Sequence, residues 1–194
     1  MAARPPTRSP GNRSAGRYVA LLRGVNVGGK NRLAMADLAA MFAAAGGTDV
    51  RTYIQSGNVI FTCAPSRARQ LPDEVGRLLA AKLGTAIPVI VRSAAELADA
   101  VTANPYRQRA ADESALHVAF LSSRPTRVRA ATLDAQRSSG DSFELRGREI
   151  YLHLPNGVAR TKLTNAYFDA RLAVTSTMRN WRTVMKLLEL TENP

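Results

Sequence analysis

The sequence predicts an α+β protein of two tandem ferredoxin-like subdomains, each with a mostly antiparallel sheet and with helices packed on one face. Three observations predict this fold class. Short apolar runs alternate with helical apolar patterns in the order β-α-β-β-α-β. The same order recurs in the second half of the chain, although residue identity between the halves is negligible. A further helical pattern follows each copy.

This repeat divides the chain into four segments. Residues 1–16 are rich in proline, glycine and arginine and predict a disordered basic tail. Residues 17–104 form the first subdomain with its C-terminal helix, residues 105–114 the linker, and residues 115–194 the second subdomain with its C-terminal helix. Asn104-Pro105 ends the first subdomain, because proline cannot continue the preceding helix.

The first half contains four strand-like runs, at residues 18–22, 50–55, 59–63 and 87–91. Ser56-Gly57-Asn58 predicts a tight turn between the second and the third run. Helical spacing predicts one helix from near Met35 to Gly46 and a second over residues 71–83 that stops at Gly84. A third helix opens with the capping box Ser93-Ala94-Ala95-Glu96.

The second half repeats this order with shorter elements. Strands are expected at residues 116–121, 143–145, 150–154 and 172–175, with a hairpin around Arg146-Gly147-Arg148. Helices are expected at residues 125–133, 161–171 and 177–190. The last of these would bury Trp181 with the apolar residues that follow at helical spacing.

Composition limits the classes of protein that fit. The net charge of +12 suggests nucleic acid as a partner, but four of the arginines, Arg4, Arg8, Arg13 and Arg17, lie in the N-terminal segment that has no acidic residue, and the others are scattered. No apolar run reaches the roughly 20 residues that cross a bilayer. The N-terminal arginines have no apolar stretch behind them, so no secretory signal is expected. The single cysteine, Cys63, predicts a reduced, cytoplasmic setting and a buried thiol.

The most site-like stretch runs from Arg23 to Asn31, between the first strand and the first helix. Its glycines and Lys30 match the first seven positions of a phosphate-binding loop, Gly-x-x-x-x-Gly-Lys. A loop that joins a strand to a helix presents backbone N–H groups to anions. The simpler alternative is a tight turn, in which Gly28 and Gly29 supply positive φ and Lys30 is solvated.

A nucleotide-hydrolysing enzyme fits this loop less well. Asn31 stands where such enzymes have a serine or threonine that holds magnesium, and no expected strand ends in an aspartate. His117 and His153 lie inside expected strands, without a second histidine or a cysteine at metal spacing. The sequence therefore predicts no catalytic residue, no metal and no cofactor.

Polar residues suited to oxygen-rich ligands gather around the loop and in three other segments. Arginine, lysine and amide side chains are those that recognise phosphate. The expected ligand-binding residues are Arg23, Asn26, Gly28, Gly29, Lys30, Gln55, Asn58, Lys162, Arg179 and Asn180. We expect non-catalytic binding of a phosphate-bearing small molecule; sequence-tolerant nucleic-acid binding and a phosphoryl- or nucleotide-handling enzyme are the alternatives.

Several separated motifs resemble the bacterial family known as domain of unknown function 1697. They occur in the same order over residues 18–190 and comprise Leu21-Leu22-Arg23-Gly24-Val25-Asn26-Val27-Gly28-Gly29-Lys30, Tyr53-Ile54-Gln55-Ser56-Gly57-Asn58-Val59, Asn104-Pro105-Tyr106, Tyr151-Leu152-His153-Leu154-Pro155-Asn156-Gly157, Thr161-Lys162-Leu163 and Thr177-Met178-Arg179-Asn180-Trp181. The resemblance implies a small α+β protein with ferredoxin-like halves, in agreement with the repeat. It implies no catalytic residue and no cofactor.

Overall fold

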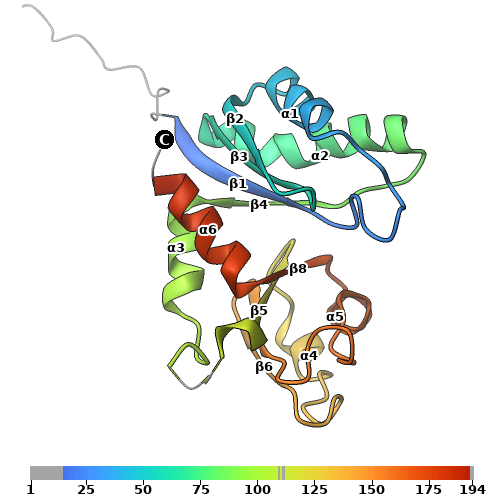
Figure 1. Ribbon diagram of the computed structural model, residues 1–194, viewed down its shortest axis with the longest axis vertical. Coiled ribbons are helices and arrows are strands. Elements are labelled where there is room, and N and C mark those ends of the chain that lie inside the picture. The colour runs from blue at the N-terminus through green and yellow to red at the C-terminus, as the bar shows by residue number, and fades with distance from the viewer. Residues whose placement is uncertain (1–14, 109, 111, 193–194) are drawn as a thin grey trace, which may run out of the picture.

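The computed structural model describes residues 15–108, 110 and 112–192. Within these residues the chain is an α+β protein with two four-stranded antiparallel sheets and six α-helices (Figure 1). Residues 1–14 of the predicted disordered tail lie outside the described residues, and its last residue, Gly16, already belongs to the first strand.

The first half forms the sheet order β2-β3-β1-β4, in which every neighbouring pair is antiparallel. Its strands are β1 (Gly16–Leu22), β2 (Thr48–Tyr53), β3 (Asn58–Cys63) and β4 (Val89–Ser93). Helices α1 (Met35–Ala44) and α2 (Pro65–Leu83) cover one face of this sheet. The free thiol of Cys63 is buried in the core beneath them, as predicted.

The second half has the corresponding order β6-β7-β5-β8, again with antiparallel neighbours. Its strands are β5 (Leu116–Leu121), β6 (Ser142–Arg146), β7 (Glu149–His153) and β8 (Ser176–Asn180). A short 3-10 helix, η1 (Glu113–Ala115), precedes β5. The helices α4 (Arg127–Ala130) and α5 (Asn165–Leu172) are shorter than their counterparts in the first half.

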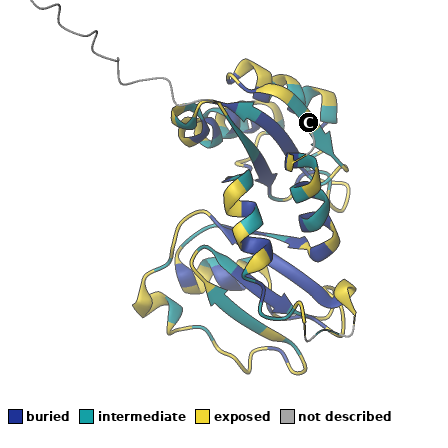
Figure 2. Ribbon diagram, turned by 90° about the vertical axis from the view of Figure 1, so that its left-hand side faces the viewer, coloured by how far each residue is buried: buried dark blue, intermediate teal, exposed yellow. Residues whose placement is uncertain are grey.

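Two further helices, α3 (Ala94–Thr102) and α6 (Trp181–Glu192), pack against each other and join the halves (Figure 1). One core cluster contains Val19 of β1, Leu97 of α3, Val118 of β5 and Trp181 of α6. Helices therefore contact both faces of the first sheet, whereas the sequence predicted helices on one face only. The reason is that β1 and β5 are apolar on both sides, and Figure 2 shows these central strands as buried.

The sequence places most elements correctly and fails near the C-terminus. Residues 172–175, predicted as a strand, belong to the end of α5 and the following loop, and residues 177–180, predicted as helix, form most of β8. The side chains of Thr177 and Arg179 alternate into a buried interface, a period of two that the longer helical pattern conceals. Asn180 then caps α6 by accepting a hydrogen bond from the Thr183 amide at 2.8 Å.

Other boundaries shift by a few residues. The fourth strand begins at Val89 rather than at Ile87, and α4 is shorter than the predicted helix over residues 125–133. The capping box at Ser93 and the left-handed Gly84 at the end of α2 are confirmed. Among the described residues, no helix has both the length and the apolar character needed to cross a membrane.

Candidate functional site

Two predicted ligand-binding residues, Arg179 and Asn58, form a buried junction between the halves. The Arg179 guanidinium donates from Nε to Asn58 Oδ1 at 2.6 Å and from Nη2 to the Leu22 carbonyl at 2.7 Å. The carbonyls of Ser56 and Gly57 accept further bonds from Nη2 at 3.2 and 3.3 Å. Burial lowers the pKa of Arg179 to about 10. Its donors are thus engaged within the chain, in a structural role.

Close approach of the chain makes glycine necessary in this junction. Gly57 has φ of +75°, and a Cβ atom on it would lie 2.7 Å from the Leu22 Cβ. Any larger residue would push the β2–β3 turn away from the end of β1. The Leu22 amide donates to the Gly57 carbonyl at 2.8 Å and fixes this arrangement.

A second buried arginine makes the reciprocal connection. Arg92 of β4 is 1% exposed and donates from Nε to Glu149 Oε1 at 2.9 Å. Its Nη2 donates to the Leu121 carbonyl at 2.8 Å and to the Arg148 carbonyl at 3.1 Å. Burial lowers the pKa of Arg92, and the nearby Glu149 opposes this shift. We call these two connections the Arg92 clamp and the Arg179 clamp.

The two clamps occupy equivalent positions. Arg92 pairs with Val19 across the β4–β1 ladder, and Arg179 pairs with Val118 across the β8–β5 ladder. The Leu121 amide donates to the Arg148 carbonyl at 2.8 Å, just as Leu22 donates to the turn of the first half. The two halves are thus alike in element order and in these hydrogen bonds. The arginine of each half donates hydrogen bonds to backbone carbonyls of the other half.

Arg23 is also engaged at the junction. Its Nη1 forms an ion pair with the Asp169 carboxylate of α5 and donates to the Ser176 carbonyl of β8 at 3.3 Å. The Ser176 amide in turn donates to Asp169 Oδ1 at 2.8 Å. The side chain of Arg23 therefore holds the edge of β8 against the first half.

The glycine-rich loop forms a tight hairpin turn. Val27 and Lys30 make an isolated antiparallel bridge, and the Lys30 amide donates to the Val27 carbonyl at 3.1 Å. Gly28 and Gly29 have φ of 57° and 75°, the values of a type I′ turn. Helix α1 begins only at Met35, so the loop does not open directly into a helix as a phosphate-binding loop does.

Asn26 holds this loop to the neighbouring β2–β3 turn. Its Nδ2 donates to the carbonyls of Leu33 and Gln55 at 2.9 and 3.0 Å, and its Oδ1 accepts from the Leu33 amide at 2.8 Å. The side chain thus fixes the backbone on both sides of a hollow of about 480 Å³. This hollow, the α1 depression, is lined by Asn26, Gly29, Arg32, Leu33, Ala34 and Gln55.

Helix α1 begins at the α1 depression without a capping side chain. Its N-cap is Ala34, which offers no oxygen to the first-turn amides. The exposed Arg32 side chain makes no hydrogen bond or ion pair in the part of the chain that the structure describes. Sequence reasoning missed Arg32; an arginine just before an uncapped helix start was the available signal.

Lys162 and Asn180 lie apart from the loop. Lys162 follows β7 in the second half, where its backbone amide donates to Ser138 Oγ at 3.1 Å. Asn180 is the cap of α6 described above. The predicted set therefore separates into the Arg179 clamp with Asn58 and Arg23, the α1 depression with Asn26, Gly29 and Gln55, and these two positions. Gly28 and Lys30 lie at the exposed tip of the loop.

The histidines have structural surroundings. His117 is buried in β5, and burial lowers its pKa. His153 stacks on Tyr106 with ring centroids 6.0 Å apart. Across residues 15–108, 110 and 112–192, no three His, Cys, Asp or Glu side chains lie close enough to hold a metal ion.

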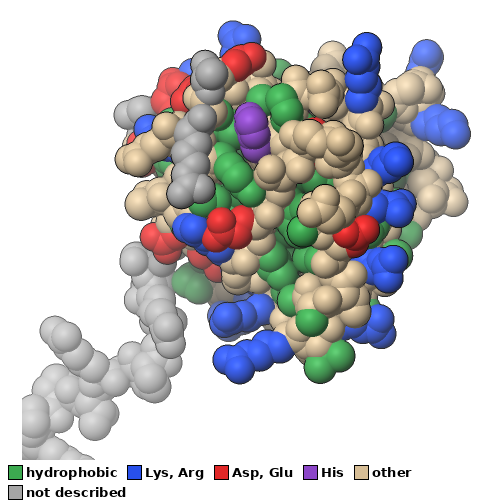
Figure 3. All heavy atoms as spheres, turned by 90° about the horizontal axis from the view of Figure 1, so that it is seen from below, with side chains coloured by type: hydrophobic (Ala, Val, Ile, Leu, Met, Phe, Trp, Pro, Cys, Tyr) green, Lys and Arg blue, Asp and Glu red, His purple; other side chains and the backbone are tan. Residues whose placement is uncertain are grey.

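Basic side chains gather on one side of the molecule's lower face. Figure 3 shows Lys and Arg along the right and lower margins of this view, with few acidic groups among them. In the second half, the exposed basic residues without an ion pair to a described residue are Arg124, Arg127, Arg129, Arg137, Arg160, Lys162, Arg171 and Arg182. Val128 stands among them with 79% of its surface exposed.

Comparison with known proteins identifies the family. The family model described as "Protein of unknown function (DUF1697)" matches residues 16–151, more than half of the chain. The chain therefore belongs to this family, as its motifs predict. A search of curated proteins gave no match.

A solved structure with a similar fold is the conserved bacterial protein SP0830 from Streptococcus pneumoniae. It is 21% identical, with a TM-score of 0.67, and the similarity covers 93% of this chain and 100% of that one. At this identity the likeness establishes the fold and no activity.

Proposed function

We propose that this member of an uncharacterised family binds a phosphate-bearing small molecule in the α1 depression. The observation that carries the proposal is the uncapped start of α1: its N-cap Ala34 lines the hollow together with Arg32, which has no ion pair among the described residues. First-turn amides and the positive end of the helix dipole favour an anion at this position. Lys30, which follows the lining residue Gly29 in the chain, is a second exposed cation in the same loop.

The proposal refines the prediction from sequence. The expected ligand site was the glycine loop itself, whereas the amides available to an anion belong to the first turn of α1. Asn26 and Gln55 contribute by shaping the hollow, and Asn58 and Arg179 support the turn that carries Gln55. We also propose that each half is ferredoxin-like, which the strand orders β2-β3-β1-β4 and β6-β7-β5-β8 support. In such a half, the hollow lies beside the loop that follows the central strand β1.

The test is thermal denaturation of the full chain with inorganic phosphate, nucleotides and sugar phosphates. A ligand at one hundred times its Kd stabilises by about 2.7 kcal/mol, which shifts the melting temperature by a few degrees. Arg32→Ala should weaken this shift. Arg160→Ala, which removes an exposed arginine elsewhere, should leave it unchanged.

A second variant separates binding from folding. Ala34→Asp supplies α1 with its own capping carboxylate, which should stabilise the helix by roughly 0.5–2 kcal/mol. The same carboxylate occupies the position of the bound anion, so that ligand-induced stabilisation should disappear. A protein that is more stable yet no longer responds to phosphate supports the proposal. An unaltered response in both Ala34→Asp and Arg32→Ala contradicts it.

The basic side of the second half favours nucleic-acid binding as a second candidate function. Arg127 and Arg129 on α4 flank the exposed Val128, without an ion pair to a described residue. Binding of this kind should weaken with salt by about one counterion per phosphate contact. Fluorescence anisotropy with a labelled oligonucleotide should show a smaller salt slope for Arg127→Glu/Arg129→Glu than for Arg51→Glu, which alters an exposed arginine in the first half. Equal slopes would remove this candidate.

A further inference from the structure

Strand β4 is an edge strand of the first sheet, with β1 as its one neighbouring strand among the described residues. The amide and carbonyl groups of every second β4 residue therefore point away from the sheet. The Arg23 amide donates to the Pro88 carbonyl at 3.1 Å, which places Pro88, and two residues further Ile90, in hydrogen-bonding contact with β1. Because the direction alternates along a strand, the amides and carbonyls of Val89 and Val91 point outward.

Part of this edge is already covered. Arg92 Nη1 donates to the Val91 carbonyl at 3.0 Å, and the Ser93 amide donates to Glu96 Oε2 at 2.8 Å. The Val89 amide, the Val89 carbonyl and the Val91 amide have no partner among the described residues. The edge of β4 is therefore open from Val89 to the Val91 amide and is covered by side chains from the Val91 carbonyl onward.

The equivalent edge of the second half is closed. Arg179 Nη1 donates to the Met178 carbonyl at 2.9 Å, as Arg92 does to Val91. The position that corresponds to Val89 is Ser176, whose amide and carbonyl bond to Asp169 and Arg23. Side chains thus cover the edge strand β8 at Ser176, whereas the edge strand β4 is uncovered at the equivalent residue, Val89.

Ser122 is one reason why β4 stays open. It occupies the place of Arg23 in the second half, because its amide donates to the Thr175 carbonyl at 2.8 Å, as the Arg23 amide does to Pro88. Its short side chain accepts a bond from the Thr175 amide at 3.1 Å and does not extend over β4 as Arg23 extends over β8. The open edge therefore follows from two differences: Ser122 does not reach the Val89 carbonyl as Arg23 reaches that of Ser176, and within the described residues no carboxylate bonds the Val89 amide as Asp169 bonds that of Ser176.

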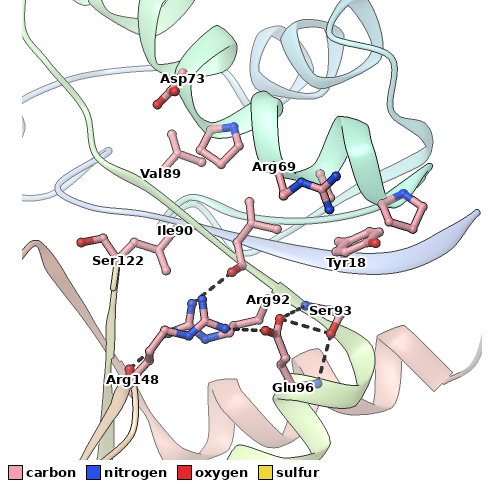
Figure 4. A pocket seen from close by; sticks show the side chains of 14 residues that line it. Tyr18, Arg69, Asp73, Val89, Ile90, Arg92, Ser93, Glu96, Ser122 and Arg148 are labelled. Carbon is pink, nitrogen blue, oxygen red and sulfur yellow. Dashed lines mark hydrogen bonds and ion pairs between the residues drawn. The ribbon is translucent and has the colours of Figure 1, made fainter. Parts of the chain in front are cut away.

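A groove runs along this open edge. Two hollows of about 760 and 620 Å³ share Val89, Ile90 and Ser122, so they form one continuous channel, which we call the β4 groove. In Figure 4, Arg69 and Asp73 of α2 lie along one wall, and Ser122 and Arg148 of the second half lie along the other. The groove has room for an extended chain beside β4.

The α2 wall carries two arginines without partners. Arg69 lines one hollow and Arg77 the other, and neither forms an ion pair within the described part of the chain. Asp73 lies between them, and Glu96 is paired with Arg148. The unpaired charge along the groove is therefore mainly positive, and an acidic occupant complements it. The chain's own N-terminal tail is basic, so it does not complement this positive charge.

We propose that the β4 groove binds an extended acidic segment of a partner protein, which adds to the first sheet as a strand beside β4. The backbone of the segment pairs with the open groups of Val89 and Val91, as in other cases of strand addition. Acidic side chains of the segment meet Arg69 and Arg77. Ser122 leaves the space that the segment occupies.

The spacing of the arginines defines the segment more closely. Arg69 and Arg77 are about 12 Å apart along α2 at 1.5 Å per residue. Strand residues four apart lie about 13 Å from each other on the same face. The best segment therefore carries two acidic residues four positions apart, with a neutral or basic residue between them opposite Asp73.

The test uses a nine-residue peptide of Thr, Val and Ser with Glu at its third and seventh positions, labelled for fluorescence anisotropy. Each backbone hydrogen bond lost should reduce affinity by up to about tenfold. In an added strand, every second amide of the peptide points toward β4. N-methylation of that alternate set of amides should therefore abolish binding, whereas N-methylation of the set that points away from β4 should leave binding nearly unchanged. Arg69→Glu/Arg77→Glu should reverse the preference, so that a peptide with Lys in place of Glu binds better.

Two protein variants complete the experiment. Val91→Pro removes an outward amide that β1 does not use, so the fold should persist while peptide binding is lost. Arg160→Glu is the matched charge control and should have no effect. Absence of binding by the Glu peptide, equal sensitivity to both methylation patterns, or competition by an oligonucleotide at equal charge would overturn the proposal.

Discussion

Arg92 and Arg179 hold equivalent positions in the two halves, but their surroundings differ. Arg92 shares its charge with Glu149, whose side chain is 16% exposed. Arg179 meets the neutral amide of Asn58 and a set of backbone carbonyls, and no carboxylate is among its partners in the described chain. The first arrangement is a buried ion pair, and the second is a buried cation solvated by the first half's backbone.

This difference shows what the family motifs do in this protein. The Arg179 clamp is built from three of the segments that carry the family resemblance, those around Leu22, Gly57 and Arg179. The Arg92 clamp contains none of them. These motifs therefore include the place where the backbone of one half fits the arginine of the other, and Asn58 and Arg179 hold the halves together there.

Removal of the Arg179 side chain should have the largest effect. Arg179→Met leaves the acceptors of Leu22, Ser56, Gly57 and Asn58 without their donor in a buried site, and should lower the free energy of unfolding by about 3–5 kcal/mol. Urea denaturation measures this loss. Arg182→Met, an exposed neighbour, should change stability by less than about 0.5 kcal/mol. A loss from Arg179→Met as small as that control would mean that the clamp is not a structural lock.

Removal of the Arg92 side chain should cost less. Arg92→Met leaves Glu149 unpaired, but this carboxylate can recover water because it is partly exposed, so we expect a loss of about 2–3 kcal/mol. Glu149→Gln keeps the hydrogen-bond acceptor and makes the Arg92 clamp resemble the Arg179 clamp. Its loss should be smaller than that of Arg92→Met, and the reverse order in urea denaturation would contradict the comparison.

The hairpin turns of the two clamps offer a matched pair of glycines. Gly57→Ala combines positive φ with a contact to the Leu22 Cβ, and should destabilise by about 2 kcal/mol. Gly147→Ala has positive φ too, but its nearest atom is Glu149 Oε2 at 3.8 Å, so about 1 kcal/mol is expected. Equal losses in thermal denaturation would show that the close approach at Gly57 is relieved by movement of the turn.

The smallest expected effect is a dependence of stability on pH that comes from His117 in the second half. His117 in β5 lies where Tyr18 lies in β1, one residue before the valine that faces the clamp arginine. Burial lowers the pKa of His117, so the unfolded chain takes up its proton at a higher pH than the folded protein. The free energy of unfolding should therefore fall as pH drops below about 6.5, the pKa of an unfolded histidine. His117→Gln should flatten this fall; an identical pH profile would mean that His117 does not contribute.

The sequence predicts helices and strands correctly where the apolar residues follow a single helical or strand spacing. Leu116–Leu121 is apolar apart from His117 and was predicted as a strand, and α2 ends at Gly84 as expected. The pattern failed at Thr177–Asn180, because this strand has only a few residues and the amphipathic spacing of α6 extends back over it. The division into subdomains at residues 104 and 115 stays a prediction, since α3 and α6 share one core with both sheets.

Residue type predicted the chemistry of the candidate site better than its location. The sequence indicates Arg23 and Arg179 as groups suited to oxygen ligands, and they do donate to oxygen atoms, but to those of the chain itself, including Asn58 Oδ1. Spacing in sequence could not reveal this, because the acceptors lie more than one hundred residues away. Arg32 and the β4 groove depend on which groups remain unpaired after folding, and a pattern of residue types does not contain that information.

The reciprocal clamps also affect the order in which the chain can fold during synthesis. Domains generally fold from the N-terminus as they emerge from the ribosome. Here the carbonyls of the β2–β3 turn gain their donor only when Arg179 of β8, the last described strand, has been made. Arg92 likewise gains its acceptors only with β5 and β7. A nascent first half would hold a charged side chain that it cannot bury. The two halves should therefore close on each other only after β8 has been made, in a single step that involves both halves.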